Sequence, residues 1–165
     1  MWLLLATLAA AEVVDRVRYV VGSRIITQSD VEFEAALDPF DESPVPALDD
    51  PAYPVEQRLV DFAVVRELAG DVSVYEPTSA EVRARFERVK ATWPRPEDHA
   101  AFLARWGVDD EHLMGLLYSR LVVERYVLRN LGAATGVPLD REGWIAAYAP
   151  WIAQQRARTT VREVR

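Results

Sequence analysis

Strand-forming patterns occur only at the two ends of this 165-residue chain. Residues 13–21 have an alternating pattern, and a Gly-Ser pair separates them from the β-branched run 24–27. A two-residue turn of this composition predicts a tight antiparallel hairpin. The other β-rich run is 159–164, and a strand this short is not stable alone. We therefore expect the last strand to pair with the N-terminal hairpin, which brings the two ends of the chain together.

The sequence between these ends predicts helices. Capping-box patterns at 29–32 and 78–81, together with Asp109 and Asp140, mark helix starts, whereas glycines and prolines mark helix ends. The expected helices cover residues 31–37, 55–69, 79 to about 91, 97–106, 112–131 and 141 to about 156, with an extended link at 72–74. The fold class that follows is mostly α, with a small antiparallel sheet formed by the N-terminal hairpin and the C-terminal strand.

Two of these helices have informative faces. Helix 55–69 has an apolar stripe at three- and four-residue spacing, which we expect to be buried. Its members are Val55, Leu59, Phe62, Val65 or Arg66, and Ala69. Helix 112–131 is apolar over most of its circumference and must contact several partners. Arg120 and Glu124 lie inside its apolar arc at a spacing that allows them to pair, and we interpret such a pair as structural.

Residues 38–54 contain five of the ten prolines and five acidic residues. Neither a helix nor a central strand tolerates this density of proline. We expect a mobile, solvated Pro-rich acidic loop that connects two helices. A regulatory or partner-binding loop is the alternative interpretation.

The first 11 residues, MWLLLATLAAA, contain no charged side chain. The apolar run is too short to span a bilayer, and the three alanines suit a signal peptidase that cuts before Glu12. We therefore expect a signal peptide at 1–11 and a single exported domain at 12–165. The absence of cysteine agrees with the oxidising periplasm. A buried N-terminal strand or a mis-assigned start codon are the alternatives.

Charge and motifs exclude several function classes. A net charge of −7 argues against general nucleic-acid binding, which needs a basic surface. The chain has no P-loop, no dinucleotide-binding glycine motif and no metalloprotease or serine-hydrolase motif. His99 and His112 lie near predicted helix starts, where neighbouring acids are explained by the helix dipole. We expect no catalytic residues, no metal, no cofactor and no enzymatic activity.

Aromatic and methionine side chains are the remaining functional signal. Core packing is the default role for each of them, and an adaptable peptide-binding groove is the alternative. The candidate peptide-binding residues are Phe102, Trp106, Met114, Tyr118, Tyr126, Trp144, Tyr148 and Trp151.

The N-terminal segment VVDRVRYVVGSRIITQSDV resembles the start of the mature chain in SurA-type periplasmic chaperones, which are related to the PrsA and trigger-factor chaperone modules. The residues that carry this resemblance are Val13, Val14, Asp15, Val17, Val20, Val21, Ile25, Ile26, Thr27, Ser29, Asp30 and Val31. Residues 102–113, 122–127 and 151–164 resemble later parts of the same module. The resemblance implies an ATP-independent chaperone, or holdase, that binds unfolded polypeptides such as outer-membrane protein precursors in the periplasm.

The chain departs from that family at two places, the Pro-rich acidic loop 38–54 and the junction before the last helix. The family carries parvulin-type prolyl isomerase domains between its long helix and its last helix, where this chain has only the junction 132–139. We therefore expect a chaperone module without isomerase activity, with no stable membrane insertion, as a monomer or a strand-exchanged dimer. A dedicated assembly protein that uses the same groove for one partner is the main alternative, and a prolyl isomerase is the disfavoured one.

Overall fold

The computed structural model describes residues 15–164 and is mostly helical, with a small antiparallel sheet, as the sequence predicts. The expected signal peptide at 1–11 lies outside the described residues. The elements in chain order are β1 (Val17–Val21), β2 (Arg24–Thr27), α1 (Gln28–Leu37), the 3₁₀ helix η1 (Asp38–Phe40), α2 (Val55–Ala69), the 3₁₀ helix η2 (Ser73–Tyr75), α3 (Ser79–Lys90), α4 (Pro96–Trp106), α5 (Asp110–Thr135), α6 (Arg141–Arg156) and β3 (Val161–Glu163).

The sheet joins the two ends of the described chain in the order β2-β1-β3. Both pairings are antiparallel, and β3 places Val161 opposite Val21. The hairpin turn needs Gly22, whose φ of 56° lies in the left-handed region that favours glycine. The predicted pairing of the last strand with the N-terminal hairpin is thus confirmed.

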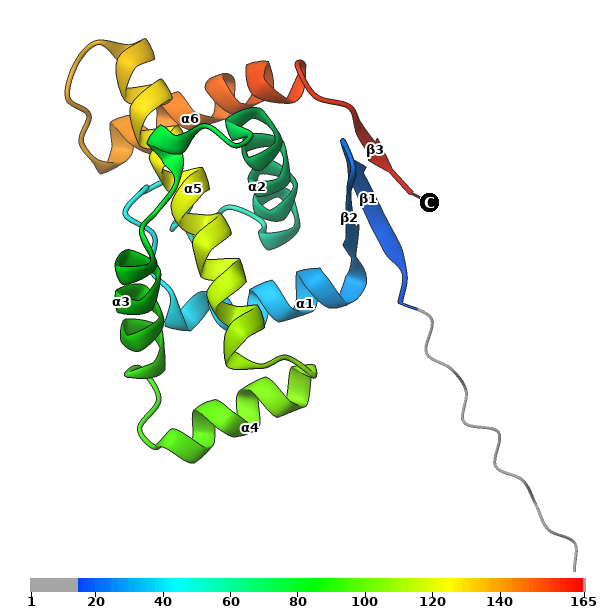
Figure 1. Cartoon of the computed structure of the whole chain (residues 1–165). Helices are drawn as coiled ribbons and strands as arrows, with labels where there is room; N and C mark the ends of the chain where they lie inside the picture. The colour runs from blue at the N-terminus through cyan, green and yellow to red at the C-terminus, as the bar shows by residue number, and fades with distance from the viewer. Residues whose placement is uncertain (1–14, 165) are drawn as a thin grey trace, which may run out of the picture.

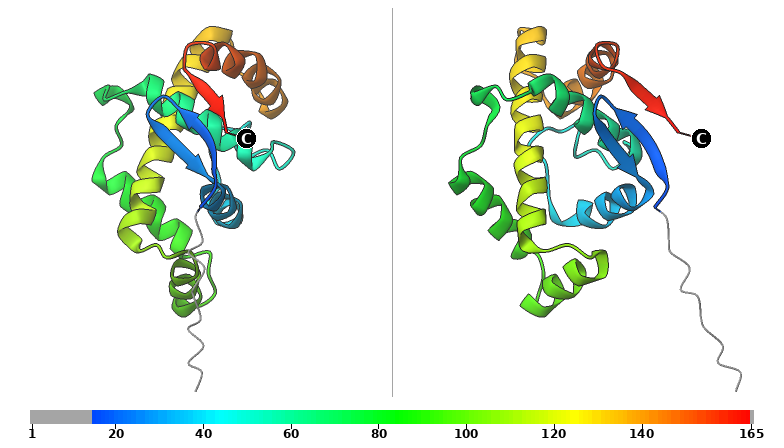
Figure 2. Two further views of the ribbon diagram at one scale, coloured as in Figure 1. Left: turned by 90° about the vertical axis from the view of Figure 1, so that its right-hand side faces the viewer. Right: turned by 45° about the vertical axis from the view of Figure 1, so that its right-hand side comes forward.

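Helix α5 runs through the middle of the molecule, with α2 and α6 near its C-terminal half and α3 and α4 around its N-terminal half (Figure 1). Figure 2 shows the sheet beside this helical body, with β3 and the start of β1 on the same side of the molecule. Helix α1 follows directly from β2 and extends from the sheet towards α5.

Three apolar clusters hold these elements together. The α5–α6 core consists of Val45, Ala47, Leu48, Val65, Ala69, Val122, Val123, Tyr126, Val127, Leu131, Tyr148, Trp151 and Ile152. The α3–α4 core consists of Leu37, Phe86, Val89, Leu103, Leu113 and Leu117. The sheet core consists of Val21, Ile26, Val60, Ala63 and Val64. Helix α5 supplies side chains to two of these cores, one at each half of the helix. This explains why its apolar arc is so wide.

The helix boundaries follow the capping residues closely, with corrections at α1, at α5 and at the link 72–74. Helix α1 begins at Gln28, earlier than expected, because Thr27 and Asp30 form the capping box at this helix start. Helix α5 continues through Gly132 to Thr135 and ends at Gly136, whose φ is 67°. The expected junction is therefore shorter than 132–139, and the expected extended link at 72–74 contains a 3₁₀ turn.

The buried face of α2 differs from the predicted stripe. Val60 and Val64 are the side chains that enter the sheet core, whereas Val65 and Ala69 enter the α5–α6 core. Helix α2 is thus buried on two sides: the predicted stripe is confirmed at Val65 and Ala69 but wrong at Leu59 and Phe62. These two side chains remain only partly buried between the two cores.

The Pro-rich acidic loop 38–54 is not a solvated connector. Val45 is fully buried, and Ala47 and Leu48 are 3% and 2% exposed within the α5–α6 core. This segment can be buried without helix or strand structure because its backbone polar groups form hydrogen bonds within the segment. For example, Leu48 N–H donates to the Val45 carbonyl at 2.9 Å. The short apolar run 45–48 packs inward, and the many prolines and acidic residues around it led to the wrong prediction of a solvated loop.

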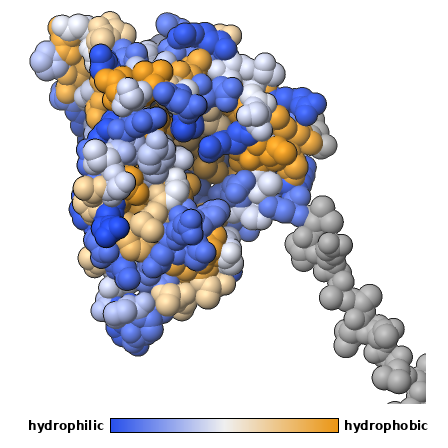
Figure 3. All heavy atoms as spheres, viewed as in Figure 1, coloured by the Kyte–Doolittle hydropathy of each residue, from blue (hydrophilic) through white to orange (hydrophobic). Residues whose placement is uncertain are grey.

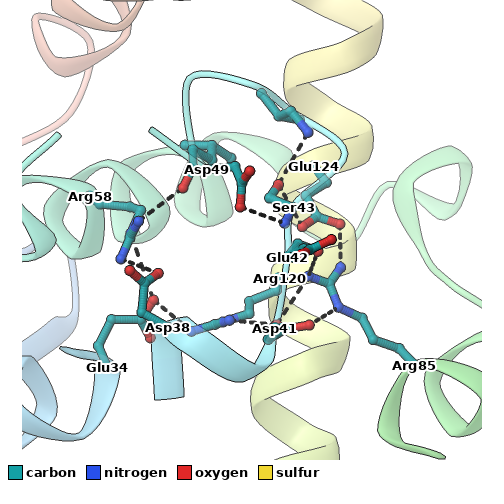
Figure 4. A network of polar contacts seen from close by, with 12 residues as sticks. Glu34, Asp38, Asp41, Glu42, Ser43, Asp49, Arg58, Arg85, Arg120 and Glu124 are labelled. Carbon is teal, nitrogen blue, oxygen red and sulfur yellow. Dashed lines mark hydrogen bonds and ion pairs between the residues drawn. The ribbon is translucent and has the colours of Figure 1, made fainter. Parts of the chain in front are cut away.

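A buried network of charges ties this segment to three helices (Figure 4). Arg85 on α3 holds both carboxylate oxygens of Asp41, at 2.7 and 3.0 Å, and reaches Glu124 at 2.5 Å. Arg120 on α5 donates to Asp41 and lies 2.6 Å from Glu34 on α1. All five side chains are at most 7% exposed.

The predicted pair within α5 does not form in this network. Arg120 and Glu124 are both buried, as expected of a structural pair, but each binds a residue from another element. Glu124 accepts from Arg85 and from the Ser43 hydroxyl at 2.9 Å. Spacing within one helix could not reveal this, because the competing partners come from segments distant in sequence.

Arg58 on α2 connects this network to two further points of the loop 38–54. It is 2% exposed, donates to the Leu48 carbonyl at 3.0 Å and contacts Asp38 at 2.5 Å. A buried charge is tolerated only where it is paired and hydrogen-bonded. The network therefore fixes α1, α2, α3, α5 and the loop in one arrangement, and this arrangement shapes the site described next.

Candidate peptide-binding groove

A groove of about 280 Å³ lies between β2, α1, α2 and α5. Figure 1 shows how these four elements, which supply the lining side chains, are arranged. Figure 3, seen from the same side, shows a hollow in the surface next to apolar surface at the strand side of the molecule. The groove is lined by Arg24, Ile25, Ile26, Asp30, Phe33, Glu34, Leu59, Phe62, Arg66, His112, Leu116, Ser119, Arg120 and Val123.

The walls of the groove are mainly apolar. Phe33 comes from α1, Leu59 and Phe62 from α2 and Leu116 from α5, and all four side chains are only partly buried. Ile25 on β2 is 57% exposed, one of the most exposed large apolar side chains among the described residues. Apolar side chains from four elements that remain open to solvent in a concave surface are typical of a binding site.

Charged side chains stand at the rim and at the floor. Arg24 and Arg66 lie at the end of the groove beside the hairpin turn, and Asp30 lies at the other end, in the first turn of α1. The buried pair of Arg120 and Glu34 forms part of the floor. Burial alone would lower the pKa of Arg120, but Glu34 and Asp41 raise its pKa overall, so the guanidinium stays charged.

The groove thus combines apolar walls with fixed charges at two ends. Nothing in it pairs a nucleophile with a base within hydrogen-bond reach, among the contacts of residues 15–164. In that same part of the chain, no three His, Asp or Glu side chains gather to hold a metal ion, and no helix is long and apolar enough to cross a membrane. The arrangement suits noncovalent binding of apolar side chains.

Three of the predicted peptide-binding residues belong to the interior. Tyr126, Tyr148 and Trp151 are 8%, 3% and 7% exposed, and all three pack in the α5–α6 core. Tyr148 also donates a hydrogen bond to Asp61 at 3.3 Å. These positions offer no open surface, so we remove them from the candidate site.

The other five predicted residues are partly buried but do not gather in one groove. Phe102 and Met114 pack against the α3–α4 core, whereas Tyr118 and Trp144 pack against the α5–α6 core. Trp106 comes nearest to the groove, because its ring lies 5.7 Å from that of Phe33, which lines the groove. The aromatic surplus in the sequence is mainly explained by two separate cores.

The residues that line the groove were not predicted from the sequence as a binding site. Leu59 and Phe62 were assigned to a buried stripe, and Leu116 to a wide apolar arc. One available signal was the consecutive pair Ile25-Ile26, since neighbouring residues in a strand face opposite sides and only Ile26 can be buried in a one-sided sheet. Phe33 gave no comparable signal in the short helix that carries it.

Two buried titratable groups lie away from the groove. Asp61 on α2 is fully buried and binds Arg156 at 2.6 Å and the hydroxyl of Tyr53, which joins α2, α6 and the loop. Burial raises the pKa of Asp61, although these partners oppose the shift. His99 is 3% exposed, lies between the rings of Phe86 and Trp93, and has a pKa lowered by burial.

No protein-family model and no curated protein matches the chain. The geometry of the groove and the sequence resemblance are the two features that bear on function. The two come together at one place, because the N-terminal motif contributes Ile25, Ile26 and Asp30 to the groove.

Proposed function

We propose that the protein is an ATP-independent chaperone that binds apolar segments of unfolded polypeptides in the groove between β2, α1, α2 and α5. The single observation that carries this proposal is the open apolar lining, with Ile25 57% exposed and Phe33, Leu59, Phe62 and Leu116 partly exposed around one cavity. A folded domain that leaves such side chains uncovered in a concavity gains free energy when another apolar group covers them.

The dimensions of the groove suit a short segment of chain. Its volume of about 280 Å³ is close to the lower end of the ~300–1,000 Å³ typical of ligand pockets. Such a space accepts one or two large side chains of a polypeptide. Affinity per site is then modest and tolerant of sequence, which is what a holdase that releases its clients without ATP requires.

The rigid surroundings support the same proposal. The network of Glu34, Asp41, Arg85, Arg120 and Glu124 connects α1 to α5 beneath the groove, so the walls do not need to be organised by the client. A preformed site loses less conformational entropy on binding than one that must order first. The resemblance to the SurA-type module adds independent support, and outer-membrane protein precursors are the client class that it implies.

The test is suppression of aggregation, with two matched variants of α5. An unfolded outer-membrane protein is diluted from denaturant, and light scattering is followed with and without the chaperone. Leu116→Asn changes the groove, whereas Leu128→Asn changes an apolar residue on the same helix that is 39% exposed outside it. We expect the wild type and Leu128→Asn to suppress scattering equally, and Leu116→Asn to lose most of the effect.

Thermal unfolding of both variants checks that the fold is retained, since the two substitutions carry the same loss of helix propensity. Absence of suppression by the wild type at several-fold molar excess would reject the proposal. Capture of one stoichiometric partner, with no effect on unfolded clients, would favour a dedicated assembly protein instead.

The proposed site of action is the periplasm, and its support comes from residues 1–11 of the sequence. Expression of the full chain in a Gram-negative host, followed by fractionation and N-terminal sequencing, tests this part separately. We expect a periplasmic product that begins at Glu12. A product retained in the cytoplasm with residues 1–11 intact would contradict it.

A further inference from the structure

The edge of β2 that faces away from β1 forms one wall of the groove. The strand order is β2-β1-β3, so β2 has a strand partner on one side only within the described part of the chain. Three consecutive residues of this strand, Arg24, Ile25 and Ile26, line the groove. The side chains of consecutive strand residues point to opposite faces of a sheet. All three residues can therefore line one groove only if the groove runs along the edge of the strand.

The hydrogen bonds of β1 show which groups of β2 are free. Gly22 N–H donates to the Thr160 carbonyl at 2.9 Å, and the Arg18 carbonyl accepts from Val164 N–H at 2.8 Å. Even-numbered residues of β1 therefore face β3, and Tyr19 and Val21 face β2 because the direction alternates along a strand.

The partners of Tyr19 and Val21 on β2 are Ile26 and Arg24. These two residues direct their backbone groups towards β1. Ile25 stands between them, so its N–H and C=O point to the free edge. An exposed strand edge with an unused donor and acceptor is a template for a further strand.

The surroundings favour an apolar, extended occupant. Helix α2 packs beneath the sheet through Val60 and Val64, and its Leu59 and Phe62 continue past β2 into the groove. A strand added along β2 lies above these two side chains. Alternate residues of that strand then point onto an apolar floor, whereas the residues between them point to solvent.

The charged side chains at the two ends of the groove indicate which charges a bound segment should carry. Arg24 and Arg66 lie beside the hairpin turn, and Asp30 lies where β2 leads into α1. Arg24 makes no ion pair within the described residues. Arg66 donates to the Gly70 carbonyl at 2.7 Å, and its ion pair there is a 3.9 Å contact with the exposed Asp71. An acidic residue at the turn end of the bound segment would complement this pair.

We propose that the occupant is an extended segment of a partner polypeptide that adds to β2 as a fourth strand, with alternating apolar side chains and an acidic residue beside Arg24 and Arg66. This inference rests on the proposed function and specifies how a client is held. Backbone pairing supplies affinity that is independent of client sequence, and the apolar floor selects alternating, β-prone segments.

The experiment uses a fluorescent peptide of seven residues, with an acidic end and apolar residues at alternate positions separated by Thr. Binding of the full chain to the unmodified peptide is compared with binding to versions methylated at one backbone nitrogen each. Methylation removes a donor and blocks pairing only where that nitrogen faces β2. We expect a loss of at least tenfold where the methylated nitrogen pairs with the Ile25 carbonyl, and smaller changes at the other positions.

Two variants of the protein provide a matched control. Ile25→Pro removes the N–H of the free edge next to the groove, whereas Val161→Pro removes an N–H on the opposite edge of the sheet. Neither nitrogen takes part in the pairing with β1, and proline is tolerated at such edge positions. We expect Ile25→Pro to weaken peptide binding at least tenfold and Val161→Pro to bind like the wild type, with thermal unfolding showing that both variants fold.

The outcomes separate this inference from the proposed function. Tight binding that is equally insensitive to methylation at every position overturns strand addition and leaves the chaperone proposal intact. Failure to bind the unmodified peptide overturns the inference, and the aggregation assay then decides the proposed function. A dimer in sedimentation experiments that dissociates in Ile25→Pro, without peptide binding, would assign the edge to a second copy of the chain and also overturn it.

Discussion

Arg120 on α5 lies 2.6 Å from Glu34 on α1, and this buried pair joins the two walls of the groove. Both side chains also line the groove, so the same contact that closes the interior forms the floor of the candidate site. Arg120 contacts Asp41 as well, which brings the loop 38–54 to the same point. The contacts of this guanidinium group therefore help to set the shape of the groove.

Replacement of Arg120 is expected to destabilise the protein strongly. Arg120→Ala leaves Glu34 and Asp41 buried with fewer partners, and removal of one member of a buried ionic network costs about 3–5 kcal/mol. Arg129→Ala on the same helix is the control, because Arg129 is exposed. Urea unfolding measures both free energies. A loss for Arg120→Ala no greater than that for Arg129→Ala would contradict the structural role of the network.

The loop 38–54 is expected to contribute to the core in solution. Leu48 is 2% exposed, and truncation of a buried leucine to alanine costs about 2–5 kcal/mol. Val74→Ala is the matched control, since Val74 is 48% exposed and its truncation should cost little. The measurement is the change in the free energy of unfolding for Leu48→Ala against Val74→Ala. Equal, small changes would indicate the solvated connector that the composition of the loop suggests.

His99 is expected to make stability depend on pH on the acid side. Burial lowers the pKa of His99 in the folded state below its ordinary value of 6.5, so the unfolded chain binds a proton first as the pH falls. The contribution of neutral His99 is present above pH 6.5 and is lost as the pH falls towards the folded pKa. His99→Phe keeps a ring between Phe86 and Trp93 but removes this titration.

Unfolding free energies of the wild type and His99→Phe, measured from pH 7.5 to pH 5, test this expectation. The wild type should lose stability relative to the variant as the pH is lowered. Parallel curves over the whole range would mean that His99 titrates alike in the folded and unfolded states.

The elements of the fold were largely predictable because their signals are local. Capping residues such as Thr78 and Asp109 and the Gly22-Ser23 turn act within a few residues of the chain. The pairing of β3 with β1 was also predictable, since a short strand needs a partner and only one candidate existed. These inferences did not require knowledge of how the helices pack.

The groove was not predictable for the opposite reason. Whether Phe62 or Tyr148 is covered depends on which distant segments pack over it. One such segment is the loop 38–54, which the sequence predicted to be a solvated connector. Tyr148 is covered in part by Tyr53 from that segment, whereas Phe62 remains at the edge of the cavity. The partners of Arg85 and Glu124 were hidden in the same way, because they come from a loop and a helix far apart in sequence.

The central claim is that unfolded polypeptide binds in the groove, and site-specific photo-crosslinking tests it most directly. A photoreactive phenylalanine derivative is placed at Leu116, inside the groove, or at Leu128, exposed outside it on the same helix. Each protein is irradiated with an unfolded outer-membrane protein. We expect crosslinks from position 116, competed by the seven-residue peptide, and only background from position 128. Equal crosslinking from both positions, or crosslinks from position 128 alone, would contradict the claim.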